Sequence, residues 1–379
     1  MTDNRPASAA YQVCTRCVMD TSAAGINFDQ EGKCNFCIEF VDEPRQKSLS
    51  SPSSQLDLTA LVDRVKANGK NKPYDCVIGV SGGVDSCWAL VRAVALGLRP
   101  LAVHMDNGWD SELAQSNIAN IVTSLGVDLL THVIEWDEYR GLMQAFFDAD
   151  VIDVELLYDN AMLAVNYNAA RRYRLRYILS GSNHATEGMA MPAEWNWYKL
   201  DKRNIKAIAK RHGGPRLTSF PALGTLGRLR YSVFHRVEWV SFLDVFDYDK
   251  EKALTYLETH FGYKRYPYKH YESIFTRFYQ GYLLPKKFGV DKRRIHLSTL
   301  VLTGQMSRSE ALAKLKEAPY PNNQDLEADR DFFLQKMRWN RQDLENYLRR
   351  PRVEHSLYSS EAWIHSGLRQ LILATRLRG

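Results

Sequence analysis

The chain has 379 residues, of which 45% are hydrophobic and 25% charged, so it can form more than one domain around a sizeable core. Its 50 Lys and Arg residues against 44 Asp and Glu residues give a formal net charge of +6. That excess suits an anionic substrate but is too small to indicate nucleic-acid binding. The first ten residues lack the apolar core of a secretory signal, and no apolar run is long enough to span a membrane. We therefore expect a cytoplasmic protein, in which disulfides are rare.

Four of the six cysteines form two C-x2-C pairs near the N-terminus, Cys14 with Cys17 and Cys34 with Cys37. This spacing is typical of zinc sites, because each pair can direct two thiolates at one ion. Four thiolates fill a tetrahedral shell, which indicates a structural rather than a catalytic metal. An iron–sulfur cluster is the alternative that four thiolates leave open. Residues 1–45 are thus predicted to form a four-cysteine zinc module with a short hairpin between the pairs.

A linker and a short helix are predicted next, over residues 46–72. The segment 46–58 is rich in Ser and Gln, and 61–67 has a helical pattern. From residue 73 to 250, short apolar runs alternate with helical segments, which predicts an α/β domain with a parallel sheet and helices on both faces. Residues 251–379 have a mostly helical pattern and are expected to complete the site. The expected strands are 75–80, 100–105, 127–134 and 177–181, and the main helices are 87–96, 111–125 and 160–176.

Ligands of such sheets bind at the carboxyl ends of the strands, so the turns there are expected to line one site. The first turn is Ser81-Gly82-Gly83-Val84-Asp85-Ser86, between a predicted strand and a predicted helix. Its glycines allow a tight turn around an anion, and the helix adds N–H groups and the positive end of its dipole. Asp85 beside a phosphate suggests a bridging Mg2+. The pattern is neither a Walker P-loop nor G-x-G-x-x-G.

The loop resembles the S-G-G-x-D-S motif of the PP-loop ATP pyrophosphatases, which cleave ATP to AMP and pyrophosphate. The resemblance implies that the loop holds pyrophosphate and that the second strand end, at His104 and Met105, contacts adenine. In the turn after the fourth strand we expect further nucleotide contacts from Gly181 and Asn183. Glu187 is a candidate for a second magnesium ligand there. His104 and His184 are candidates for proton transfer, although His184 could equally be a polar loop residue without a chemical role.

Basic residues gather at 286–294, in a run that resembles the lysine-bearing segment of PP-loop synthetases such as asparagine synthetase. The resemblance implies that this run completes the pyrophosphate site, and a solvated basic face is the alternative. The catalytic candidates are Asp85, Asp106, Lys286, Lys287 and Lys292.

Together with the cysteine pairs and the segment from Asp106 to Ala114, the loop resembles the N-acetyl sugar amidotransferases of bacterial surface-polysaccharide (O-antigen) biosynthesis. This implies conversion of an acetamido group on a nucleotide-linked sugar into an acetamidino group. Asn107, Trp109 and Glu112 are candidates for reading the sugar or the amide, with packing as the alternative for Trp109. Position 2 is Thr and no cysteine has a glutaminase-like setting, so we expect ammonia from a separate glutaminase subunit. The resemblance adds a cyclase-like barrel subunit as a conduit.

Two other functions compete with this hypothesis. A tRNA-modifying PP-loop enzyme, of the thiolase or lysidine synthetase type, could use the aromatic and basic stretch 263–270 for RNA stacking. The same stretch could equally hold the nucleotide of a sugar donor. Sulfur transfer, however, generally needs further cysteines, and none follows Cys87. A non-catalytic zinc scaffold is the second rival, and the intact loop argues against it.

Overall fold

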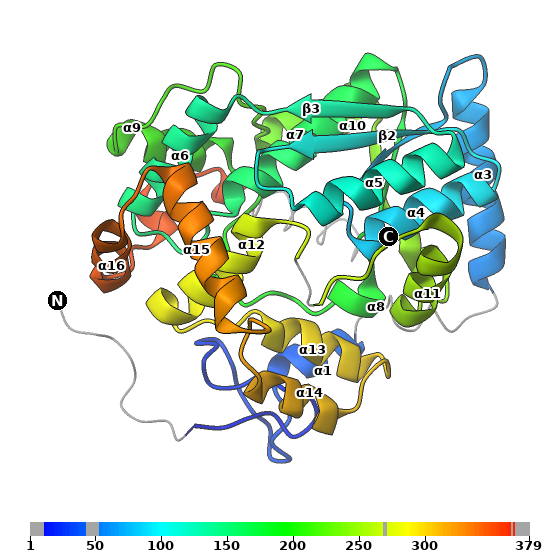
Figure 1. Ribbon diagram of the computed structural model, residues 1–379. Helices are drawn as coiled ribbons and strands as arrows, with labels where there is room; N and C mark the ends of the chain where they lie inside the picture. Colours follow the sequence, from blue (N-terminus) through cyan, green and yellow to red (C-terminus); the bar gives the residue numbers. More distant parts are fainter. Residues whose placement is uncertain (1–10, 43–52, 268–270, 365–366, 368–379) are drawn as a thin grey trace.

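The computed structural model describes residues 11–42, 53–267, 271–364 and 367 (Figure 1). Its centre is a five-stranded sheet in the order β3-β2-β1-β4-β5, and every neighbouring pair is parallel. This confirms the predicted α/β class, and β5 is a strand that the sequence did not predict. The strands are β1 (Cys76–Gly79), β2 (Pro100–Asp106), β3 (Leu129–Val133), β4 (Tyr177–Ser180) and β5 (Glu238–Ser241).

Helices cover both faces of the sheet because its central strands bury alternate side chains on opposite sides. In β1, Val77 faces one core cluster while Cys76 and Ile78 face the other. The cluster with Cys76 also contains apolar residues of α3 (Ser53–Gly69), α4 (Val84–Ala95), α5 (Glu112–Leu125) and α11 (Lys250–Phe261). The cluster with Val77 contains those of α6 (Trp136–Asp148), α7 (Leu156–Arg172) and α9 (Lys202–Arg211), and α10 (Thr225–Phe234) packs beside α7.

Several element boundaries differ from the predicted ones. Helix α4 begins at Val84, so its first turn includes the end of the 81–86 loop. Helix α3 begins at Ser53, inside the segment predicted as a linker, and the remaining linker residues up to 52 lie outside the described part. Helix α7 begins before the predicted 160 and ends before 176, and α6 was not predicted. These shifts are of the kind expected where tertiary packing decides the ends of a helix.

The C-terminal region is mostly helical, as predicted. No helix in the described ranges is long and apolar enough to cross a membrane. The elements are α12 (Ile274–Phe278), the π-helical η3 (Tyr279–Phe288), α13 (Arg293–Leu302), α14 (Arg308–Lys316), α15 (Asn323–Met337), α16 (Arg341–Arg349) and η4 (His355–Leu357). Shorter elements before it are α8 (His184–Glu187), η1 (Ala193–Trp195) and η2 (Phe242–Val245).

The cysteine module packs against this C-terminal region. Two isolated antiparallel bridges, Val13 with Asp20 and Phe28 with Cys34, precede α1 (Asn35–Asp42). Figure 1 shows the module, in dark blue, beside α13 and α14. Val18 is buried in a small cluster with apolar residues of those two helices. The described part of the module, residues 11–42, therefore shares its core with segments about 280 positions later in the chain.

Candidate functional site

Two loops meet where the order of the strands reverses. The chain passes from β1 to β2 and β3 on one side of the sheet, and then to β4 and β5 on the other. In such sheets the crevice at the carboxyl ends of the two central strands is where ligands bind. The 81–86 loop follows β1 and the 181–188 turn follows β4. A Cβ added at Gly181 would lie 2.7 Å from the backbone carbonyl carbon of Asp85, so the two loops touch.

The backbone of the 81–86 loop fits an anion cradle. Gly82 has a φ of +81°, and a Cβ there would lie 2.7 Å from the carbonyl oxygen of Ala114, so only glycine is tolerated. Ser86 Oγ accepts from the N–H of Ser81 at 3.2 Å and donates to the carbonyl of Gly83 at 3.0 Å. These bonds close the loop on itself. The N–H groups in the first turn of α4 have no partner within that helix, so its positive end is available for an anion at the crevice.

Two side chains hold Asp85 at this crevice. The sequence analysis did not identify Tyr248, and it named Asn183 without predicting its contact with Asp85. The hydroxyl of Tyr248 donates to Asp85 Oδ1 at 2.5 Å, and Asn183 Nδ2 donates to the same oxygen at 3.4 Å. Burial, and then the charge of Asp85, raise the pKa of Tyr248, so this tyrosine stays protonated. The charge of Glu187 acts in the same direction, which places a second carboxylate nearby. Asp85 and Glu187 offer the oxygen ligands that Mg2+ prefers.

Two further tyrosines hold the 81–86 loop by hydrogen bonds to its backbone. The hydroxyls of Tyr263 and Tyr266 donate to the carbonyl of Gly82 at 3.1 and 3.0 Å. Tyr263 is buried, so its ring is part of the core. Residues 268–270 of the same stretch lie outside the described part. Within the described part of this stretch, the hydroxyls of Tyr263 and Tyr266 are therefore used to hold the loop.

At the end of β2, the ring of His104 is engaged by the protein itself. Its Nδ1 lies 2.9 Å from the carbonyl oxygen of Val80, and its Nε2 lies 2.9 Å from Asp110 Oδ2. Burial lowers the pKa of His104, but the hydrogen bond and charge of Asp110 outweigh it, so the pKa is raised. Because both partners are acceptors, a protonated ring satisfies both. The imidazole thus links the end of β1 to the segment after β2.

The residues that follow β2 serve mainly to shape the turn. Met105 is buried in the core, and the Asp106 carboxylate accepts from the N–H of Gly108 at 2.8 Å. Asn107 is buried as well and its Oδ1 accepts from the N–H of Trp109 at 3.1 Å. Trp109 is 0% exposed and packs against several aromatic rings, so the packing alternative replaces its predicted sugar contact. Those rings are Trp136, Phe275, Phe332 and Phe333.

Glu112 and Glu272 lie near the N-terminus of α5. Glu112 is exposed in the first turn of α5. The N–H of Ser111 donates to the carbonyl of Glu272 at 2.9 Å. A Cβ added at Gly83 would lie 3.8 Å from Glu272 Oε1, so this carboxylate borders the loop. Sequence reasoning missed Glu272 because more than 150 residues separate it from the loop.

The three lysines proposed for pyrophosphate have different surroundings. Lys287 is fully buried, donates to the carbonyls of Tyr347 and Arg350 and pairs with Asp150 at 2.9 Å. All three of its donors are used, so Lys287 is a structural cation and its predicted catalytic role is wrong. Lys292 Nζ pairs with Glu155 at 2.6 Å in a largely buried site. Lys286 is exposed and lies over the ring of Tyr282.

The four N-terminal cysteines converge as predicted. All four side chains are buried, and their sulfur atoms lie within 4.8 Å of one another. The sulfurs of Cys14 and Cys37 are 3.7 Å apart, and those of Cys17 and Cys34 are 3.6 Å apart. Four sulfurs at about 2.3 Å around a tetrahedral zinc ion would be about 3.8 Å apart. The donor set and its spacing therefore fit a tetrahedral metal ion.

The other two cysteines are unsuited to catalysis. Cys76 and Cys87 are both buried in the core under α4. Burial is the main cause that raises the pKa of Cys87 to about 12, so the thiolate is not available at neutral pH. This agrees with the expectation that neither thiol is a glutaminase nucleophile.

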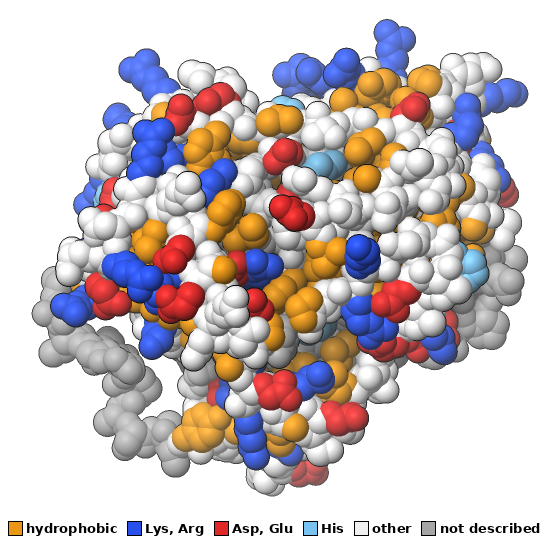
Figure 2. All heavy atoms as spheres, in the orientation of Figure 1, with side chains coloured by type: hydrophobic (Ala, Val, Ile, Leu, Met, Phe, Trp, Pro, Cys, Tyr) orange, Lys and Arg blue, Asp and Glu red, His pale blue; other side chains and the backbone are white. Residues whose placement is uncertain are grey.

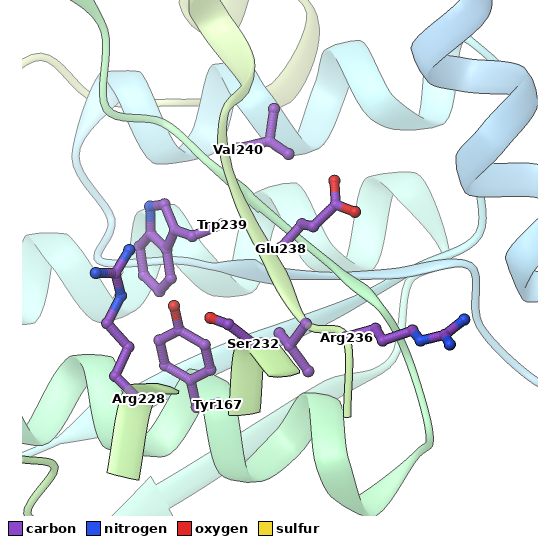
Figure 3. Close-up of a pocket in the computed structure, with 8 residues that line it drawn as sticks. Tyr167, Arg228, Ser232, Arg236, Glu238, Trp239 and Val240 are labelled. Atoms are coloured by element: carbon purple, nitrogen blue, oxygen red, sulfur yellow. The ribbon is translucent and has the colours of Figure 1, made fainter. Parts of the chain in front are cut away.

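A separate cavity of about 470 Å³ lies between α10 and β5 (Figure 3). Figure 3 shows Arg228, Tyr167 and Trp239 at one end and Arg236 at the other. Its lining follows β5 from Val237 to Val240 and contains no residue of the 81–86 loop or the 181–188 turn. We therefore do not assign this cavity to the candidate site.

The surface charges do not form a single large patch on the visible face. Figure 2 shows Lys and Arg side chains interspersed with Asp and Glu over that face. A mixed distribution agrees with the modest net charge of +6. It gives no support to an extended nucleic-acid footprint on that side of the molecule.

The solved structures that match this chain include three of low identity. The NMN synthetase from Francisella tularensis is 15% identical, with a TM-score of 0.30, and the match covers 60% of this chain and 100% of that one. The NH3-dependent NAD synthetase from Campylobacter jejuni is 18% identical, with a TM-score of 0.28 and coverages of 67% and 97%. A predicted tRNA methyltransferase subunit from Methanocaldococcus jannaschii is 14% identical, with a TM-score of 0.28 and coverages of 48% and 74%. Among curated proteins, none matches this chain.

The family comparison is specific to the C-terminal region. Residues 272–369 match the family of the LPS biosynthesis protein WbpG-like C-terminal domain. The match begins at Glu272, the residue whose backbone and carboxylate border the 81–86 loop. Residues 272–369 of this chain are therefore similar to the C-terminal domain of the WbpG-like LPS biosynthesis proteins.

Proposed function

We propose that the protein is an ATP-dependent N-acetyl sugar amidotransferase of lipopolysaccharide biosynthesis, which forms AMP and pyrophosphate. The observation that carries the proposal is the meeting of the 81–86 loop and the 181–188 turn at the strand-order reversal, where Asn183 contacts Asp85. Support for the pathway comes from the WbpG-like domain that borders the same loop. The loop motif and the cysteine pairs support the reaction class by their resemblance to this enzyme family.

The proposed chemistry has two steps. The amide oxygen of the acetamido group attacks the α-phosphorus of ATP, the bond to the β-phosphate breaks and pyrophosphate leaves. Ammonia then attacks the carbon of the O-adenylyl imidate, the carbon–oxygen bond breaks, AMP leaves with that oxygen and a proton is lost. The oxygen of the amide is thereby replaced by NH. Without adenylation this oxygen would be a very poor leaving group.

The residues of the site would act by positioning and by electrostatics. The first-turn N–H groups of α4, with the hydroxyls of Ser81 and Ser86, would bind the departing pyrophosphate. Asp85 and Glu187 would hold Mg2+, which would neutralise phosphate charge as the bond breaks. Tyr248, kept protonated by burial, would fix Asp85 in place. Of the predicted lysines, Lys286 has an exposed side chain and is the first candidate for the phosphates. Lys292 would have to leave its ion pair with Glu155 to bind them.

The nitrogen source is proposed to be a separate glutaminase subunit, with a cyclase-like barrel subunit as a conduit. Both uncommitted cysteines, Cys76 and Cys87, are buried, which supports an external supply of ammonia. With glutamine in place of ammonium, the purified chain is expected to leave the sugar unchanged. Glutamate release by this chain alone would contradict this part of the proposal.

The deciding experiment measures the nucleotide product and the mass of the sugar together. The purified chain is incubated with ATP, Mg2+, ammonium chloride and a panel of UDP-linked N-acetyl sugars. We expect AMP, pyrophosphate and a sugar whose mass shows oxygen replaced by NH, with no sugar change when ammonium is omitted. AMP without a changed sugar would direct the search to other acceptors such as tRNA. ADP, or no ATP turnover with any acceptor, would contradict the proposal.

A further inference from the structure

The cysteine module reaches the candidate site through one aromatic contact. Phe40, on α1 directly after the second cysteine pair, stacks on His184 with ring centroids 4.4 Å apart and an interplanar angle of 4°. Both side chains are buried, at 3% and 4% exposure. His184 begins α8 and directly follows Asn183, which donates to Asp85. The stack therefore links the cysteine module to the turn that contacts the 81–86 loop.

Helix α13 makes a second link between the same two regions. His296 Nδ1 lies 3.0 Å from the carbonyl oxygen of Thr186, and Thr303 Oγ1 donates to the carbonyl of Ala185 at 2.9 Å. From the same helix, Ser298 Oγ accepts from the N–H of Val18 at 3.1 Å. Arg294 pairs with Asp20 at 2.8 Å and donates to the carbonyl of Val18. Helix α13 and the residue after it thus contact both the segment that follows the first cysteine pair and the turn after β4.

The cysteine pairs themselves anchor these contacts. Arg308, at the start of α14, donates to the carbonyls of Cys14 at 2.7 Å and Cys17 at 3.0 Å. The described part of the module is only residues 11–42, so a filled sulfur cluster would stabilise its geometry, as in small metal-stabilised domains. Phe40 follows Cys37 by three residues on one helix, and a metal ion at the cluster would set the position of that helix. The contacts form a continuous path from the sulfur cluster to the turn beside Asp85.

We infer that the cysteine module is a positioning element for the nucleotide site and that Phe40 is the positioning residue for His184. This stack fixes the start of α8 and so keeps Asn183, its N-cap, in contact with Asp85. Loss of the aromatic ring, or of the metal, releases the turn and weakens nucleotide binding even where the fold persists. The inference rests on the proposed function because it assumes that the turn after β4 contacts the nucleotide.

The test compares two phenylalanines of the same module. Phe40→Leu removes the ring that stacks on His184, and Phe28→Leu removes a partly buried ring beside Cys34 as a matched control. Each variant is assayed for bound metal, melting temperature and the Kd of ATP with Mg2+ by calorimetry. We expect Phe40→Leu to raise this Kd about three- to tenfold while keeping its metal, and Phe40→Trp to restore it. Phe28→Leu is expected to leave the Kd near the wild-type value.

A second measurement reads the stack without nucleotide. The imidazole proton resonances of His184, assigned by an H184Q variant, carry a ring-current shift from Phe40 in the full-length protein. We expect this shift to vanish in Phe40→Leu and on removal of the metal with a chelator, and to persist in Phe28→Leu. A shift that survives metal removal would overturn the coupling to the sulfur cluster. An unchanged ATP Kd in Phe40→Leu, with the shift lost, would overturn the positioning role.

These outcomes are separable from failure of the proposed function. If the wild-type chain binds no ATP, the proposed function fails, and the positioning role of Phe40 falls with it. If the wild-type chain binds ATP and forms AMP while Phe40→Leu does so equally well, only the inference fails. If Phe40→Leu and Phe28→Leu raise the Kd by the same factor, the effect is general destabilisation of the module and the positioning role is refuted.

Discussion

The loop at 81–86 and the basic run at 286–294 both resemble anion sites in the sequence, yet the fold uses them differently. The donors of the loop are backbone N–H groups, and their direction is set locally by the positive φ of Gly82 and the start of α4. The charges of the basic run lie at the ends of long side chains, which tertiary partners occupy. Lys287 pairs with Asp150, Lys292 with Glu155 and Arg294 with Asp20. The local sequence thus determines where backbone donors point, whereas the tertiary surroundings determine which partner a long basic side chain contacts.

The largest effect is expected at the loop. Asp85→Asn keeps the size of the side chain and a partner for Tyr248 but removes the charge that would hold Mg2+. We expect AMP formation to fall about 100- to 1,000-fold, in the range found when a transition-state electrostatic contact is lost. Melting temperature, measured on the same sample, should change little. Near-wild-type AMP formation by this variant would remove Asp85 from the proposed mechanism.

In the basic run, the expected effect is on stability. Lys287→Met leaves the buried Asp150 with only Arg350 as a cation and two carbonyls without their donor. We expect the free energy of unfolding to fall by about 3 kcal/mol, measured by urea denaturation. Lys286→Met, one position earlier at an exposed side chain, is the matched control and should change stability by less than about 0.5 kcal/mol.

The same pair of variants decides where a phosphate-binding lysine lies. If Lys286 reaches the nucleotide, Lys286→Met raises the KM for ATP with the melting temperature unchanged. If Lys287→Met is instead as stable as the wild type but has lost AMP formation, its assignment as a structural cation is incorrect.

The smallest expected effect is on the pH dependence of the free energy of unfolding. It tests the tertiary contact between His104 and Asp110, beside the 81–86 loop. The pKa of His104 is raised because Asp110 outweighs the effect of burial. A raised folded-state pKa contributes stability that is fully present below the unfolded value of about 6.5 and is lost as the pH rises through the folded value. We expect Asp110→Asn to cost about 2 kcal/mol at low pH and less at alkaline pH. Equal losses at pH 6 and pH 9, in urea denaturation, would argue against a protonated His104.

Much of the fold was predictable because its signals are local. The apolar runs at β1, β2 and β4 and the helices between them have periodicities that a short window reveals. The strand β5 was missed because Glu238-Trp239-Val240-Ser241 is only four residues long and has no buried run. The start of α3 was missed because its Ser-rich segment, with Pro52 before it, has the composition of a loop.

The candidate site likewise has one part that was predictable from local sequence and one part that was not. The loop, the turn after β4 and the cysteine pairs are contiguous motifs whose spacing carries their chemistry. The contacts of Tyr248, Tyr263 and Glu272 with the loop were missed because these residues lie more than 150 positions away, and no sequence pattern marks such a contact. Trp109 was misjudged for a related reason. An aromatic residue in a turn near the site has the same sequence pattern whether it contacts a ligand or packs in the core.

By itself, the sequence determined the parallel α/β architecture, the place of the anion loop and the four cysteines that converge. These follow from hydrophobic periodicity, glycine backbone freedom and ligand spacing, each of which acts over a few residues. Only the tertiary structure decided that Lys287 is a buried structural cation, that His104 braces a strand end and that Phe40 stacks on His184. Those outcomes depend on which side chains from distant segments meet in a low-dielectric interior, where unpaired charges and donors are costly and partners are therefore found.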